Sequence, residues 1–189
     1  MKNVEFYTTP QGEVEIKSAE GVRTYTRECK DVTNDMCLAI ETDYPGAFRA
    51  LSAEYKRSAD NPAFFKFLVV HRFMRCNFGR YDHIDDIDGN GAFHFERVEC
   101  PLRGHECKFC GIICNPKFNT DMGAMQTDVM MLYCRNVDPY EIAERLNTTF
   151  ENVRAHIAKA YRKKDVHSKS EFCQWAEKNN IFQNLQKNG

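Results

Sequence analysis

The chain has 189 residues, of which 42% are hydrophobic, and its formal net charge is −1. This length allows one compact domain or two small ones, and the apolar fraction excludes a chain that is disordered throughout. A net charge close to zero gives no sign of a nucleic-acid partner, so such a partner has to be sought in local charged patches.

The start of the chain, Met1–Phe6, lacks the apolar region of a signal peptide, and no apolar run reaches membrane-spanning length. We therefore expect a cytoplasmic protein that contacts no membrane. Nine cysteines in such a chain favour metal binding or burial over disulfides.

The first thirty residues are predicted to form short strands, because Val14 and Ile16 alternate with polar residues. Residues 32–76 are predicted to be helical, since their apolar side chains recur about one helical turn apart. Within this region a Tyr-Pro-Gly sequence at 44–46 interrupts the helical pattern, and Asn61 followed by proline begins another helix.

Residues 77–118 are rich in glycine and cysteine and are predicted to be irregular, with a linker close to residues 115–120. The remainder is predicted to be helical. We therefore expect a mainly α protein with two domains: an α+β N-terminal domain over residues 1–118, and a helical C-terminal domain over residues 119–189.

Three helix starts in the C-terminal domain carry capping residues. Asp138 can cap one helix, with proline at the first helical position and Glu141 closing a capping box. Thr148 or Thr149 can cap the next helix, and Ser168 can cap a final one. Such closely spaced starts predict two short helices joined by a tight turn, followed by a further helix.

The predicted helix at residues 150–164 has one apolar and one basic face. Val153, Ile157 and Ala160 fall on one stripe, which can pack on the preceding helix through Ile142, Ala143 and Leu146. The opposite face is small and cationic, as in a helix that enters the major groove, where arginine and lysine can bind guanine and glutamate can accept from cytosine. Other polar side chains are placed to contact phosphates. The residues predicted to contact DNA are Thr149, Glu151, Asn152, Arg154, Ala155, Ala158, Lys159, Arg162, Lys163 and Lys169.

This segment resembles the LuxR/GerE-type DNA-binding domain. The matching residues are Asp138, Glu141-Ile142-Ala143, Leu146, Thr148-Thr149, Asn152-Val153-Arg154-Ala155-His156, Lys163 and Val166-His167-Ser168-Lys169. The resemblance covers about the last third of the chain and implies a four-helix domain, base-reading positions at Arg154, Ala155 and Ala158, and dimerisation through the last helix. The helix-turn-helix of sigma-factor region four shares part of the motif, but the extra helix after Ser168 favours the LuxR type.

The chain departs from the family pattern at four places. It has Met125-Gln126 where the family has Arg-Glu, Asn136 at the turn glycine, Lys164 at a leucine, and Ala158 at a common base-contacting lysine. These changes leave the expected fold intact but bear on which DNA sequence is read.

Four cysteines lie within fifteen residues, at positions 100, 107, 110 and 114. The two-residue gap between Cys107 and Cys110 lets both sulfurs meet one tetrahedral ion, and nearby glycines allow the tight turns of a zinc knuckle. The preferred ligand set for a structural zinc is Cys100, Cys107, Cys110 and Cys114, and in the second set Cys76 replaces Cys110. Reduced thiols in a core and an iron–sulfur cluster are the alternatives.

These features predict a DNA-binding transcriptional regulator that binds double-stranded DNA as a homodimer through its C-terminal helix. The N-terminal domain would sense an effector or contact a protein. The alternative is a protein-interaction adaptor that engages transcription machinery without operator recognition. An enzyme is not expected, because the sequence shows neither a Ser/His/Asp signature nor a phosphate-binding loop.

Overall fold

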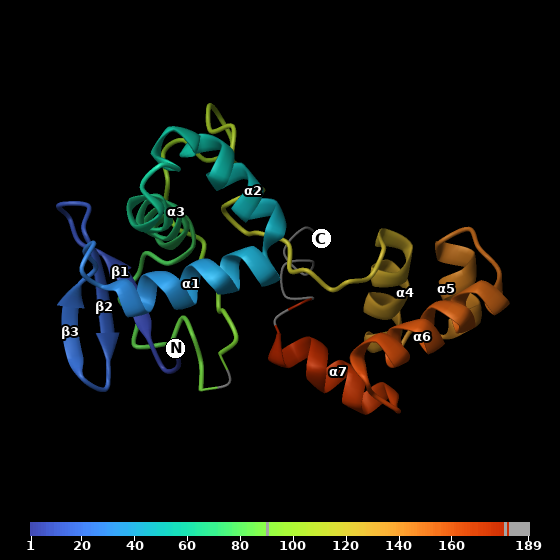
Figure 1. Cartoon of the computed structure of the whole chain (residues 1–189). Coiled ribbons are helices and arrows are strands. Elements are labelled where there is room, and N and C mark those ends of the chain that lie inside the picture. Colours follow the sequence, from blue (N-terminus) through green and yellow to red (C-terminus); the bar gives the residue numbers. More distant parts are fainter. Residues whose placement is uncertain (90, 180, 182–189) are drawn as a thin grey trace. The chain divides into compact units, whose positions relative to one another are not determined.

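The computed structural model describes residues 1–89, 91–179 and 181, which contain seven α-helices and one three-stranded antiparallel sheet (Figure 1). The fold is therefore mixed, with helices predominating, as expected. The chain divides into two compact units, Met1–Asn119 and Thr120–Gly189. None of the helices formed by the described residues is long and apolar enough to cross a membrane.

The N-terminal unit begins with the sheet, whose strands β1 (Glu5–Thr8), β2 (Val14–Ser18) and β3 (Gly21–Thr24) are hydrogen-bonded in chain order. The turn between β1 and β2 closes through a hydrogen bond from the Gly12 N–H to the Thr9 carbonyl. Gly12 has a φ of +86°, a left-handed conformation that favours glycine. The predicted strands in this region are thus confirmed.

Three helices follow the sheet: α1 (Lys30–Asp43), α2 (Pro45–Glu54) and α3 (Pro62–Asn77), with a short 3₁₀ helix at Lys56–Ser58. The expected break at residues 44–46 is confirmed, since α1 ends before Tyr44 and α2 begins at the proline. Asn61 caps α3, because its side chain accepts a hydrogen bond from the Phe64 N–H at 3.1 Å.

Helix α3 is central to this unit and contacts α1, α2, β1 and β2. Its buried side chains join those of the sheet and of α1 in one hydrophobic core. The largest fully buried members of this core are Phe6, Met36, Ile40, Leu51, Phe73, Met74, Phe78, Ile87 and Ile113.

The segment from Phe78 to Asn119 forms no helix and no extended strand in its described residues, as expected for a glycine- and cysteine-rich region. It is held to the core by long-range hydrogen bonds. The Asp86 carboxylate accepts from the Phe6 N–H at 2.6 Å, and the Glu5 carboxylate accepts from two backbone N–H groups of the segment, those of Asp82 and His83, at 2.8 Å each.

The C-terminal unit contains four helices: α4 (Ala124–Cys134), α5 (Pro139–Arg145), α6 (Phe150–Lys164) and α7 (Lys169–Lys178). The expected caps are present. Asp138 accepts from the Tyr140 N–H at 2.8 Å, Thr149 from the Asn152 N–H and Ser168 from the Glu171 N–H, both at 3.2 Å. Of the two threonines considered for α6, Thr149 is therefore the cap.

Candidate nucleic-acid interface and cysteine cluster

The turn between α5 and α6 is closed by backbone hydrogen bonds. The Asn147 N–H donates to the Glu144 carbonyl at 3.1 Å, and the Thr148 N–H donates to the Ala143 carbonyl at 2.9 Å. Asn147 has a φ of +49°, a left-handed conformation that asparagine tolerates better than most residues. These bonds join the two helices through a short, well-defined turn, as expected from the sequence.

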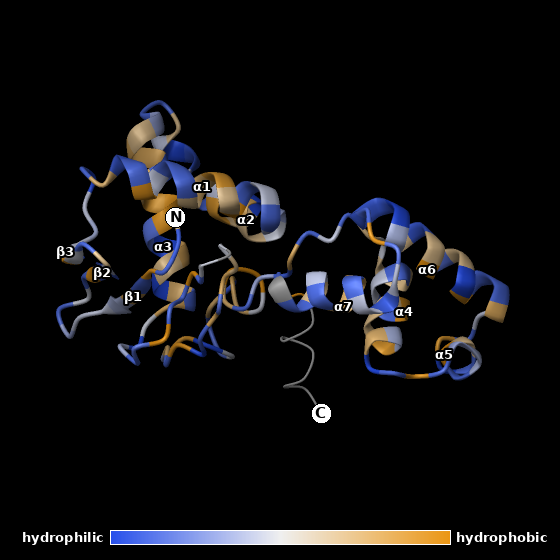
Figure 2. Ribbon diagram, turned by 90° about the horizontal axis from the view of Figure 1, so that it is seen from below, coloured by the Kyte–Doolittle hydropathy of each residue, from blue (hydrophilic) through white to orange (hydrophobic). Residues whose placement is uncertain are grey.

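The inner face of α6 is fixed by packing. Val153 and Ala160 are fully buried, and Ile157 packs against the cluster formed by Val129, Ile142, Ala143 and Val153. The predicted stripe and its contacts with α5 are confirmed, and α4 adds Val129 to the same core. In Figure 2 hydrophilic and hydrophobic residues alternate along α6, as a helix with one buried face requires.

A polar contact adds to this packing. The Gln126 side chain of α4 is buried and donates a hydrogen bond to the His156 carbonyl of α6 at 2.9 Å. Glutamine at this position is one of the departures from the family pattern. The rotation of α6 about its own axis is thus set by apolar contacts with α5 and by a side-chain hydrogen bond from α4.

The outer face of α6 carries nearly all the residues predicted to contact DNA. Arg154, Lys159 and Arg162 are exposed, and no ion pair between described residues involves any of them. The other exposed members are Thr149, Glu151, Asn152, Ala155, Ala158 and Lys163. Their charges and small side chains are therefore accessible to a partner.

Lys169 differs from the other predicted contacts because it is half-buried. Its ammonium donates to the Asn136 side-chain oxygen at 2.7 Å and lies 4.6 Å from the centre of the Tyr133 ring. Asn136, which replaces the turn glycine of the family, has a φ of +61° and thus adopts the left-handed conformation that the glycine would. Lys169 therefore ties the start of α7 to the turn after α4.

Two further cations at the end of α6 contact their own unit. The Lys163 ammonium donates to the Asp121 carbonyl, and the Lys164 ammonium lies 3.8 Å from the Asp121 carboxylate and 4.7 Å from the centre of the Trp175 ring. Burial lowers the pKa of Lys164. The cations of α6 that make the fewest contacts within their own unit are therefore Arg154, Lys159 and Arg162.

Sequence reasoning missed an aromatic pair beside this face. Tyr140, near the start of α5, is 64% exposed and stacks on the Phe150 ring with centroids 4.1 Å apart and an interplanar angle of 5°. The Arg154 guanidinium lies 5.8 Å from the centre of the same Phe150 ring. The stack joins the starts of two helices, so no periodicity within either one could reveal it.

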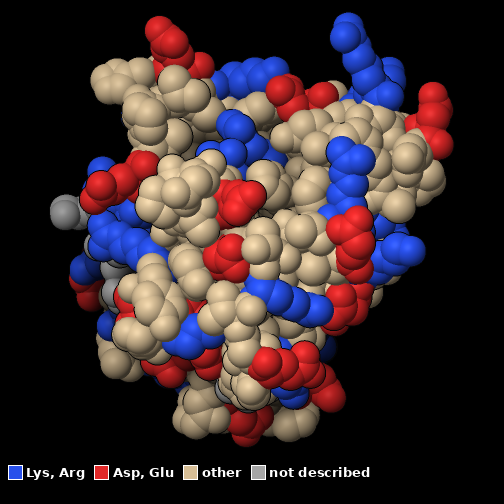
Figure 3. Space-filling view, turned by 90° about the vertical axis from the view of Figure 1, so that its left-hand side faces the viewer, with Lys and Arg blue, Asp and Glu red and all other residues tan. Residues whose placement is uncertain are grey.

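The charge on α6 contrasts with that on the N-terminal unit. Helix α6 holds five basic residues and one acidic residue. On the face of the N-terminal unit that carries the sheet, basic and acidic side chains are intermixed (Figure 3). Positive charge is therefore more concentrated on α6 than on that face of the N-terminal unit.

All nine cysteines are free thiols, and among the described residues no three or more His, Cys, Asp or Glu side chains stand together as a metal-binding group. Cys100 and Cys110 are exposed, whereas Cys76, Cys107 and Cys114 are half-buried. Cys76 lies in the last turn of α3, and the other four belong to the irregular segment that follows.

Comparison of the chain with models of protein families, with curated proteins and with solved structures gave no match.

Proposed function

We propose that the protein is a transcriptional regulator that binds double-stranded DNA in a sequence-specific manner and reads the major groove with α6. The proposal is supported above all by the exposed, cationic outer face of α6, held by α5 and a short turn as the second helix of a helix-turn-helix. In this role Arg154 and Lys159 contact base edges, and the small Ala155 and Ala158 let the helix backbone approach the groove floor.

The start of α5 adds an aromatic side chain to the interface. Tyr140, exposed at the start of α5, is placed to contact the sugar–phosphate backbone beside the groove. Asn152, Arg162 and Lys163 would then set the register of α6 on the duplex rather than its sequence preference.

We further propose that the protein acts as a homodimer through α7, as the resemblance implies. A dimer with twofold symmetry binds two half-sites about one helical turn, roughly 34 Å, apart. The selected DNA should therefore contain an inverted repeat with that spacing.

Selection of bound sequences from a random duplex pool, followed by gel-shift titration over a range of salt concentrations, tests the proposal. We expect one preferred site and a steep loss of affinity with salt, because each neutralised phosphate releases counterions. Arg154→Ala should remove preference at one or two base positions, at a cost of about 1–3 kcal/mol at the preferred base. Arg162→Ala should weaken binding to all sequences and lower the salt slope by about one.

A matched control is Arg57→Ala, which removes an exposed cation from the 3₁₀ helix of the N-terminal unit. This variant should bind DNA as the unaltered protein does. If the unaltered protein binds no duplex at low salt, the regulator proposal fails, and the adaptor becomes the better account of the C-terminal unit. If Arg154→Ala keeps the full sequence preference, α6 is not the reading helix.

A further inference from the structure

The end of α3 is joined to the cysteine-rich segment by one buried side chain. The Asn77 amide donates hydrogen bonds to the carbonyls of Phe73 and Ile113, at 3.0 and 2.9 Å, and its oxygen accepts from the Asn115 N–H at 3.0 Å. Cys114 lies between Ile113 and Asn115, the two segment residues that Asn77 bonds. Cys76 directly precedes Asn77 in α3. These bonds therefore hold Cys114 beside the last turn of α3.

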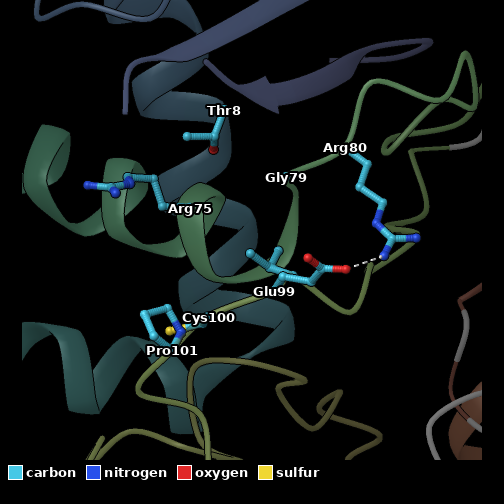
Figure 4. A pocket seen from close by; sticks show the side chains of 8 residues that line it. Thr8, Arg75, Gly79, Arg80, Glu99, Cys100 and Pro101 are labelled. Carbon is cyan, nitrogen blue, oxygen red and sulfur yellow. Dashed lines mark hydrogen bonds and ion pairs between the residues drawn. The ribbon is translucent and has the colours of Figure 1, made fainter. Parts of the chain in front are cut away.

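The same end of α3 is approached by Cys100. Cys100 and Arg75, the residue before Cys76, line one hollow of the N-terminal unit (Figure 4). From Cys100 the chain turns back on itself, because the Arg103 N–H donates to the Cys100 carbonyl and the Cys107 N–H to the Leu102 carbonyl. Gly104, with a φ of +80°, permits this reversal.

Three cysteines of the irregular segment act electrostatically on the Cys76 thiol. Burial raises the pKa of the Cys76 thiol most, the positive charge of Arg72 lowers it, and the charges of Cys114, Cys107 and Cys100 raise it again. Cys110 is the remaining thiol of the segment. Its thiol is exposed, and its neighbour Gly111 donates its N–H toward the sulfur of Cys114 at 3.4 Å.

The surroundings are suited to a group of thiolates. The Arg72 guanidinium offers a fixed positive charge that acts on the Cys76 thiol. Four thiolates and one Zn²⁺ carry a net charge of −2, which Arg72 and the Gly111 N–H would partly offset. A tetrahedral set of four sulfurs is the arrangement of a closed structural zinc site, with zinc–sulfur distances of about 2.3 Å.

We propose that Cys76, Cys100, Cys107 and Cys114 bind one structural Zn²⁺ and that Cys110 is not a ligand. The ion would link the last turn of α3 to a segment that forms no helix or strand in its described part. To bind the ion, the turns at 100–107 and 109–114 move so that their sulfurs converge on Cys76. Metal binding and ordering of this segment would thus be coupled.

Metal analysis of the full chain, produced with zinc in the medium and purified without chelator, tests this site. We expect about one zinc per chain and no iron. Cys76→Ser and Cys107→Ser should each lose most of the metal. The matched control, Cys110→Ser, should keep it, although it changes the same residue type within the same segment.

Alkylation of the folded, unaltered protein gives a second measurement that needs no variant. Iodoacetamide should label Cys110 and leave the four ligands protected until a chelator removes the metal. Less than half an equivalent of zinc, iron in its place, or protection of Cys110 together with labelling of Cys76 would each overturn the proposed ligand set. These outcomes concern the N-terminal unit and do not depend on DNA binding.

The two thiols of the C-terminal unit lie close together. The Sγ atoms of Cys134, at the end of α4, and Cys173, in α7, are 2.7 Å apart. Both thiols are half-buried, and burial raises the pKa of Cys134 first of all. A disulfide between Cys134 and Cys173 would join α4 to α7.

We infer that Cys134 and Cys173 form a reversible disulfide on exposure to a low-molecular-weight disulfide such as oxidised glutathione. The two thiols lose two protons and two electrons, a sulfur–sulfur bond forms between them, and the bond of the oxidant is cleaved to two thiols. The disulfide would close a loop of 39 residues and so constrain the unfolded chain. The melting temperature of this unit should therefore rise by more than about 10 °C.

Peptide mass mapping after treatment with oxidised glutathione checks this inference. A peptide pair containing Cys134 and Cys173 should appear, together with a higher melting temperature, and dithiothreitol should reverse both. Cys173→Ser should show neither change. Glutathione attached separately to the two residues, or a cross-link without thermal stabilisation, would refute it.

Discussion

The two units of the molecule are stabilised by contacts of different range. In the C-terminal unit the helix caps join residues two or three positions apart, such as Thr149 with Asn152 and Ser168 with Glu171. In the N-terminal unit the decisive polar contacts join residues far apart, such as Phe6 with Asp86 at a separation of 80 residues and Asn77 with Ile113 at 36. Local contacts can be read from a sequence, whereas long-range ones arise only when the chain has folded.

At a fixed pH the largest effect is expected from Asn77, whose buried side chain bonds two distant residues of the irregular segment. Asn77→Ala leaves the Ile113 carbonyl and the Asn115 N–H without their buried partner, and each such loss costs about 1–3 kcal/mol. We expect the free energy of unfolding of the N-terminal unit to fall by about 3 kcal/mol. Urea unfolding followed by circular dichroism measures this loss.

The control for this variant is Asn34→Ala. Asn34 is exposed and bonds only one lysine, Lys66, in the contacts that the structure shows for its side chain. Its loss should change stability by no more than about 0.5 kcal/mol. Equal effects of the two variants would mean that the irregular segment does not depend on Asn77.

The next effect, smaller for each pH unit, is a pH dependence of the N-terminal unit. The pKa of Asp86 is raised from 3.8 to about 9, chiefly by burial and also by the carboxylates of Glu96, Glu5 and Asp82, against the opposing hydrogen bond from the Phe6 N–H. Because the folded pKa lies above the unfolded one, the folded protein keeps a proton that the unfolded chain releases. This contribution to stability is fully present below pH 3.8 and is lost as the pH rises toward 9.

Asp86→Asn tests this dependence, because asparagine keeps the acceptor for Phe6 and does not ionise. The stability of the variant relative to the unaltered protein should increase by up to about 1.4 kcal/mol for each pH unit between about pH 5 and pH 8. Denaturant unfolding at several pH values measures the difference. A difference that stays constant over this range would show that Asp86 is ionised in the folded protein.

The smallest effect is expected from a local contact in the C-terminal unit. Thr149→Ala removes the cap of α6 and should cost about 1 kcal/mol. Trp175 is the one tryptophan of the chain and lies in α7, so its fluorescence follows the unfolding of this unit. Thr148→Ala, at the neighbouring position, loses only a side-chain contact with Asn152 and should cost less. A larger loss for Thr148→Ala would reverse the assignment of the cap.

The fold of the C-terminal unit followed closely from the sequence because its signals are local. Caps at Asp138, Thr149 and Ser168 begin the helices where they were expected, and a period of 3.6 residues placed Val153 and Ala160 inside. The exposure of Arg154, Lys159 and Arg162 follows from the same period, since they lie opposite the buried stripe. The stacking of Tyr140 on Phe150 did not follow, because it depends on how two helices meet.

The sequence likewise does not show which cysteines are brought together in space. Spacing along the chain pairs Cys107 with Cys110 as candidate metal ligands, because the sequence can show only which residues are neighbours along the chain. The fold sets Cys114 beside the end of α3 through Asn77, which is why our proposed ligand set includes Cys76. The closeness of Cys134 and Cys173 likewise results from the packing of α7 near α4.

The amino-acid sequence by itself determined where the capped helices start, which side of α6 is apolar, and that positive charge collects on the other side, because these properties depend on residues within a few turns of one another. Tertiary structure decided which thiols meet, which lysines are engaged within their own unit, and how a segment without helices or strands is held to its core. Those outcomes depend on hydrogen bonds and packing between residues that the sequence separates by tens of positions, and no local pattern encodes such pairings.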